Sequence, residues 1–190
     1  MRWLMLYARS RQVPASAAVV TLTALVVWAL TQGSTDSEEL GIAALVLSTN
    51  VAAASVGLSG QDAALDRTAA IRWMPRRAAH VLLIGAIAGA ALLVLQAAGV
   101  KLAPTEVVVR DSAGLVGLAA LGATLCGAQY AWTLPTGWLA LTLLAPPPGG
   151  TAGQVVSWMI LPPATTAATG TAWALLATGT VLYAVAGPRH

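Results

Sequence analysis

The sequence predicts an all-α membrane protein, a bundle of six transmembrane helices with both termini in the cytoplasm. Hydrophobic residues make up 57% of the chain and charged residues only 9%, and the mean hydropathy is +0.75. Soluble domains carry about 25% charged residues, so most of this surface must face lipid rather than water. Several apolar stretches approach the roughly 20 residues that a spanning helix needs. The arginines gather on one side of these stretches and give the orientation.

The first four predicted spans are regular. The first covers residues 14–31 and opens with Pro14, which suits the first position of a helix. The second covers residues 40–58 and follows an acidic segment, residues 36–39, which complements the positive end of a helix. The third and fourth cover residues 78–100 and 113–130. With the two spans that follow, they make residues 1–190 a single transmembrane domain.

The last third of the chain is interrupted by proline. The fifth predicted span, residues 135–146, is short because a run of three prolines ends the helix. A second apolar stretch, residues 155–161, is cut off by two more prolines. The sixth predicted span covers residues 164–186. We therefore expect a broken segment, residues 146–163, between the fifth and sixth helices.

Charge placement gives the topology. With the N-terminus in the cytoplasm, eight of the ten basic residues are cytoplasmic, and Lys101 and Arg110 lie outside. Five of the seven acidic residues also lie outside, namely Asp36, Glu38, Glu39, Glu106 and Asp111. Because cytoplasmic loops carry the excess of Lys and Arg, we expect both termini inside. The Ala-, Gly- and Arg-rich composition favours a bacterial cytoplasmic membrane.

The interiors of the predicted spans hold no Asp, Glu, Lys or Arg. Proton-coupled transporters carry such groups as relays, so their absence argues against a proton-driven machine and an intramembrane enzyme. The polar residue nearest a membrane centre is Asn50, which either bonds between helices or touches a transported substrate. The single cysteine, Cys126, excludes an internal disulfide and a multi-cysteine metal site.

The longest cytoplasmic connection, residues 59–77, predicts a short helix that Ser59 caps and Pro75 ends. Two interpretations remain open: the helix lies on the bilayer, or it docks on a cytoplasmic partner. The residues that would contact such a partner are Asp62, Leu65, Asp66, Arg67, Thr68, Ala69 and Arg72.

The N-terminus predicts a second amphipathic helix that lies along the inner leaflet before Pro14. Aromatic and basic side chains at both cytoplasmic elements are typical of anchors at the lipid headgroups. These predicted anchors are Trp3, Arg9, Arg11, Trp73, Arg76 and Arg77.

These parts in this order resemble the membrane subunits of ABC-2 type (type V) ABC exporters. Residues 62–77, with the run Leu65-Asp66-Arg67-Thr68 and the exit Pro75-Arg76-Arg77, look like the coupling helix of that family and its exit. Residues 146–163 look like its broken re-entrant segment, although the residues alone also allow a segment on the outer surface. The resemblance covers the whole chain as architecture.

The resemblance implies a permease subunit that exports an apolar or amphipathic substrate. A Walker A motif is absent, so ATP and Mg²⁺ would bind a separate ABC ATPase pair. The other implied partners are a second membrane subunit, identical or related, and membrane lipids, with no nucleic acid. The chain itself would carry no catalytic residue, metal or cofactor. The alternatives are a structural or regulatory subunit of a larger complex and the substrate-binding component of an uptake transporter.

Overall fold

The computed structural model describes residues 36–55, 58, 73–97, 102–144 and 149–189, and within these ranges the regular structure is entirely helical. The elements are α3 (Asp36–Ser55), α5 (Trp73–Ala97), α6 (Thr105–Leu125), η3 (Ala128–Tyr130), α7 (Thr133–Leu144), α8 (Gly150–Val156), η4 (Trp158–Ile160) and α9 (Thr166–Ala186). In the described part of the chain, α5, α6 and α9 are long and apolar enough to cross a membrane. An all-helical fold with membrane-length apolar helices is thereby confirmed, and the count of six stays a prediction.

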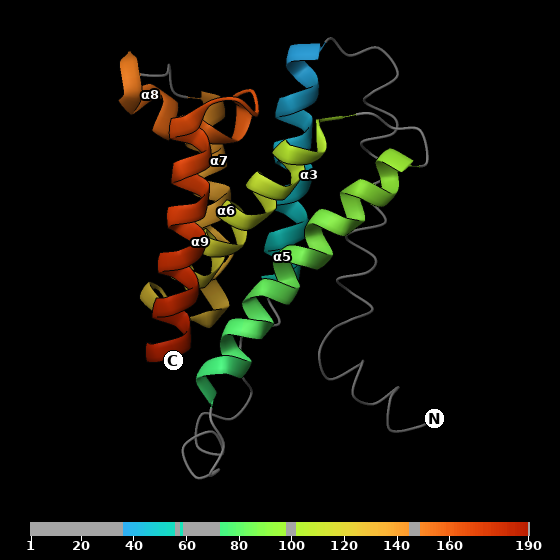
Figure 1. Cartoon of the computed structure of the whole chain (residues 1–190). Coiled ribbons are helices and arrows are strands. Elements are labelled where there is room, and N and C mark those ends of the chain that lie inside the picture. The colour runs from blue at the N-terminus through green and yellow to red at the C-terminus, as the bar shows by residue number, and fades with distance from the viewer. Residues whose placement is uncertain (1–35, 56–57, 59–72, 98–101, 145–148, 190) are drawn as a thin grey trace.

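Helix α6 is the centre of the bundle. It packs against α3, α5, α7 and α9 (Figure 1). Its most apolar window is 83% buried, whereas the corresponding windows of α5 and α9 are 33% and 28% buried. Helices α3, α6 and α9 begin at the end of the bundle where α8 lies, called here the α8 end, and α5 and α7 begin at the opposite end. The protein core is therefore arranged around one helix.

Small residues bring the neighbouring helices close to α6. A Cβ added to Gly117 would collide with the backbone of Leu175 in α9, and one added to Gly179 would collide with the carbonyl group of Gly117. On the α5 side, a Cβ on Gly89 would lie 3.0 Å from Ser112 Oγ. Such close contacts increase the van der Waals attraction between the helices, which is a main cause of helix association in lipid.

Helix α6 begins at Thr105, eight residues before the start that the sequence analysis gave to the fourth span. The carbonyl oxygen of Pro104 accepts hydrogen bonds from Val107 N and Val108 N at 3.0 and 3.1 Å. The expectation that Arg110 and Asp111 lie in an outer loop is wrong, because both belong to the second turn of α6.

Helix α5 begins at Trp73, so residues 73–75 belong to it and do not end a separate cytoplasmic helix. The expected stop at Pro75 is wrong because Pro75 lies in the first turn, where a helix needs no N–H donor. The other predicted coupling residues (59–72), the N-terminal helix with Trp3, Arg9 and Arg11, and the span at 14–31 lie outside the described residues.

The end of the chain closes the bundle opposite α8. Gly187 ends α9 at a φ of +74°, which favours glycine. Beyond it, Arg189 N donates to Ala123 O at 3.1 Å, and Ala128 N donates to Arg189 O at 3.2 Å. The tail thus supplies partners to backbone groups at and just beyond the C-terminus of α6, which the helix itself leaves unpaired.

Candidate functional site

A buried ion pair lies in α6. The side chains of Arg110 and Asp111 are 4% and 0% exposed, and Arg110 Nε donates to Asp111 Oδ1 at 2.8 Å. Burying two charges is costly, and it is tolerated where each charge finds a partner and further hydrogen bonds. We expected no Asp, Glu, Lys or Arg within the fourth span, residues 113–130, but the helix begins at Thr105 and so contains both charges.

Arg110 also holds the segment that leads into α9. Its Nη2 donates to Leu161 O at 2.9 Å, and its Nη1 donates to Pro162 O at 3.2 Å. Leu161 lies between η4 and α9 and belongs to neither helix, so its carbonyl group has no place in a helical hydrogen-bond ladder. The guanidinium therefore joins α6 to the turn at residues 161–163.

Only one of the two carboxylate oxygens of Asp111 has a hydrogen-bond partner among the described residues. Its Oδ2 atom is buried and has no hydrogen-bond partner among the described residues. Ser112 and Gly117 face α5 and α9, respectively, and successive residues of a helix are rotated by about 100°. Asp111 therefore faces the remaining side of α6, where α3 and α7 pack. A buried carboxylate oxygen without a donor marks this position as a candidate functional site.

The broken segment is fixed to the bundle on two sides. Trp158 of η4 is fully buried, and its ring lies against Gly114 of α6 so closely that a Cβ there would collide with it. On the other side, Trp138 Nε1 and Thr142 Oγ1 of α7 both donate to Val156 O, at 2.9 and 3.0 Å. Residues 156–158 are therefore packed between α6 and α7, with α8 before them and the turn into α9 after them.

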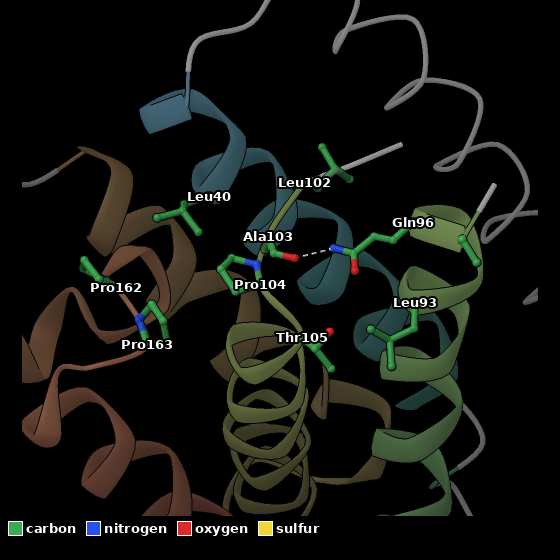
Figure 2. A pocket seen from close by; sticks show the side chains of 10 residues that line it. Leu40, Leu93, Gln96, Leu102, Ala103, Pro104, Thr105, Pro162 and Pro163 are labelled. Atoms are coloured by element: carbon green, nitrogen blue, oxygen red, sulfur yellow. Dashed lines mark hydrogen bonds between the residues drawn. The ribbon is translucent and has the colours of Figure 1, made fainter. Parts of the chain in front are cut away.

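An open pocket of about 710 Å³ lies next to the turn that Arg110 holds. Figure 2 shows the lining side chains, which come from α3, α5, the start of α6 and the turn before α9. They are Leu40, Leu93, Gln96, Ala97, Leu102, Ala103, Pro104, Thr105, Pro162 and Pro163. The lining is mostly apolar, and the amide of Gln96 already donates from Nε2 to Ala103 O at 2.6 Å. Such a pocket suits an apolar group better than a charged one.

Asn50 is buried in α3, and its Oδ1 atom has no hydrogen-bond partner within the described ranges. The exposed side chain of Leu45 marks the outer face of α3, and the helical spacing places Asn50 on the opposite, core side. Asn50 does not line the pocket at the α8 end. Its role in a transport pathway stays a prediction.

The predicted anchors that the structure describes lie at the start of α5. The guanidinium carbon of Arg76 lies 6.0 Å from the centre of the Trp73 ring. Arg77 lies beside Gly187, since a Cβ there would be 2.7 Å from Arg77 Nη1. Close by in the chain, Tyr183 donates its hydroxyl to Leu58 O at 3.0 Å. The end opposite α8 thus carries the positive charges of α5 and of the C-terminal tail.

The sequence analysis missed Arg110 and Asp111 because it read charged residues as the limit of a span. Their signal was present: the pair is adjacent and of opposite sign, and three valines precede it without a turn residue. The described ranges contain no group of His, Cys, Asp and Glu that could hold a metal ion. Comparisons with family models, curated proteins and solved structures found no match for this chain.

Proposed function

We propose that this chain is the transmembrane permease subunit of an ABC-2 type exporter for an apolar or amphipathic substrate, driven by a separate ATPase chain. The observation that carries the proposal is the broken segment between α7 and α9. Helix α7 has 12 residues, about 18 Å at 1.5 Å per residue, and a hydrocarbon core is about 30 Å thick. The chain then continues as α8 and η4 rather than as a full span.

Irregular backbone at membrane depth is tolerated where protein or a water-filled cavity surrounds it, which is typical of transport proteins. Here Trp158 is fully buried, and the carbonyl groups of Val156, Leu161 and Pro162 accept hydrogen bonds from side chains of α7 and α6. A re-entrant segment of an exporter would need this kind of support. In this proposal the segment closes the outer end of the pathway.

The orientation in the proposal follows the positive charges. Arg76 and Arg77 at the start of α5 and Arg189 at the chain end lie opposite α8. Since Lys and Arg favour the cytoplasmic side, the α8 end faces outward and the C-terminus faces the cytoplasm of a bacterial cell. The segment at 59–72 then lies on the cytoplasmic side, where an ATPase could dock on Asp66 and Arg67.

The residues on both sides of that segment would transmit a movement of the partner ATPase to the helix bundle. Before it, the backbone carbonyl of Leu58 is held by the hydroxyl of Tyr183 in α9. After it, the next described element is α5, which begins at Trp73. ATP and Mg²⁺ would bind the partner ATPases, and a second membrane subunit, identical or related, would complete the pathway.

The pocket at the α8 end favours one alternative, a binding component of an uptake transporter, because it opens where an external substrate would arrive. Specific capture requires convergent polar groups, and the amide of Gln96 is already used by Ala103. The exporter proposal therefore stands first. A purely structural subunit would not need the broken segment.

The deciding experiment purifies the full chain, tagged after His190, from membranes of its own organism in mild detergent. The proposal expects an ABC ATPase to co-purify in defined stoichiometry and its ATP hydrolysis to respond to the membrane chain. The single variants Asp66→Ala and Arg67→Ala should lower that response several-fold. Glu106→Gln, which changes an exposed carboxylate at the α8 end, is the matched control and should leave it unchanged.

Recovery of the intact chain without any ABC ATPase would refute the exporter proposal. If an ATPase co-purifies but both variants hydrolyse ATP as the control does, the docking residues are wrong and the coupling helix assignment fails.

A further inference from the structure

We propose that Asp111 is a proton-binding site, and that the proton it takes up releases the turn at residues 161–163 from α6. This inference goes beyond the exporter proposal and does not depend on it, because every group involved belongs to this chain. It concerns the side of the bundle where α8 lies.

The two oxygen atoms of Asp111 have unequal surroundings. Oδ1 accepts a hydrogen bond from Arg110 Nε, whereas Oδ2 has no partner in the described structure although the side chain is 0% exposed. An ionised carboxylate accepts several hydrogen bonds in water and loses them on burial. A proton delivered from water to Oδ2 forms one O–H bond, breaks no bond within the protein and removes the buried negative charge.

Protonation of Asp111 would change the charge environment of Arg110. Its guanidinium donates at once to Asp111, to Leu161 O and to Pro162 O. Once Asp111 is neutral, the buried positive charge has no counter-charge, and an arginine side chain near the end of a membrane helix reaches towards the headgroups instead. Asp111 lies only six positions, roughly 9 Å of helix, after the first residue of α6. The guanidinium would leave the two carbonyl oxygens, and the turn would lose these two hydrogen bonds to α6.

No other ionisable group described at this end replaces Arg110 or Asp111. Glu106 on α6 is exposed, and α5 carries Arg76, Arg77 and His80 at the opposite end. The described parts of α7, α8, η4 and α9 hold no Asp, Glu, Lys, Arg or His. Helix α3 carries Asp36, Glu38 and Glu39 in its first turn and no ionisable residue from Leu40 to Ser55.

The released turn borders the pocket. Pro162 and Pro163 form part of the lining (Figure 2). Pro162 O is one of the two carbonyl oxygens that accept hydrogen bonds from Arg110. Protonation of Asp111 would thus loosen one wall of the pocket. A low pH on the α8 side is therefore the condition under which this wall of the pocket loosens.

The test measures how fast a water-soluble maleimide labels a cysteine in the broken segment. The full chain in lipid nanodiscs carries Cys126→Ser together with either Leu161→Cys or Gly149→Cys. Leu161 lies in the turn, is partly buried and packs against the core, so it reports release, whereas Gly149 is exposed with open space around its Cα. The ratio of the two labelling rates cancels the effect of pH on thiol reactivity. We expect this ratio to rise roughly tenfold or more as the pH falls.

Asp111→Asn mimics the protonated carboxyl group and should give a high ratio at every pH. The double variant R110Q/D111N replaces both charges by amides of similar shape, which protects folding, and should also lose the pH dependence. Glu106→Gln is the control and should keep the wild-type profile. A flat wild-type profile would overturn the proposal, and so would a pH dependence that persists in the folded double variant.

Discussion

At the residue scale, single glycines decide how closely two helices approach. The backbones of α6 and α9 touch at Gly117 and Gly179, where any side chain would meet the backbone of the other helix. Gly170, also in α9, has open space around it. The sequence showed that small residues are common, but only the structure distinguishes the glycine that is needed for contact from the one that is not.

The change Gly179→Ala should therefore destabilise the protein by about 3 kcal/mol, since backbone cannot move aside as a side chain can. Gly170→Ala, the matched control in the same helix, should be neutral or stabilising by up to about 1 kcal/mol. Unfolding titrations in mixed detergent, followed by circular dichroism, measure both. Equal effects of the two changes would contradict the close α6–α9 contact.

At the scale of elements, η4 is a three-residue helix whose place depends on one side chain. Trp158 fills the space that Gly114 leaves open on α6, and the tryptophan is fully buried. The sequence predicted the interruption between the fifth and sixth helices from its prolines. It did not predict this contact, because Trp158 and Gly114 are 44 positions apart and carry no pattern that pairs them.

The contact between Gly114 and Trp158 predicts that the stability costs of substitutions at the two positions are not additive. Gly114→Ala alone should cost about 1–3 kcal/mol, because the new methyl group pushes against the ring. Trp158→Ala alone should cost about 3–5 kcal/mol through the cavity that it leaves. In the double variant the added methyl group meets no ring, so Gly114→Ala should cost nothing further. A double-mutant cycle on unfolding free energies checks this, and additive costs would show that the two residues do not touch.

At the scale of the whole molecule, the bundle has two differently built ends. The α8 end has an irregular segment held by Arg110, and the opposite end is closed by backbone hydrogen bonds from Arg189. Apolar composition was enough to predict an all-helical fold with helices long and apolar enough to cross a membrane. It could not predict that α6 is shielded from lipid, because apolar residues look alike in the sequence whether they face lipid or protein.

The opposite end yields a prediction about coupling across the molecule. Tyr183→Phe removes the hydroxyl that binds Leu58 O and should cost about 1 kcal/mol of stability. If the proposed function holds, this variant should also lower the stimulation of the partner ATPase, because the segment after Leu58 loses a fixed point on α9. Thr178→Val, which removes an exposed hydroxyl bonded only within α9, is the control. A Tyr183→Phe complex that matches this control in ATP hydrolysis would place the coupling elsewhere.

The burial of α6 also bears on how the chain is made. On insertion scales, Arg and Asp each oppose entry of an isolated helix into lipid by about 2.5–3.5 kcal/mol at its centre, and less near its ends. Arg110 and Asp111 cancel each other's charge, but two acceptors of Arg110 are the carbonyl oxygens of residues 161 and 162, which are synthesised later. Arg110 can therefore reach these two acceptors only after residues 161 and 162 have been synthesised. The segment that leads into α9 thus completes the hydrogen bonding of a charged side chain in α6, a helix that is synthesised before it.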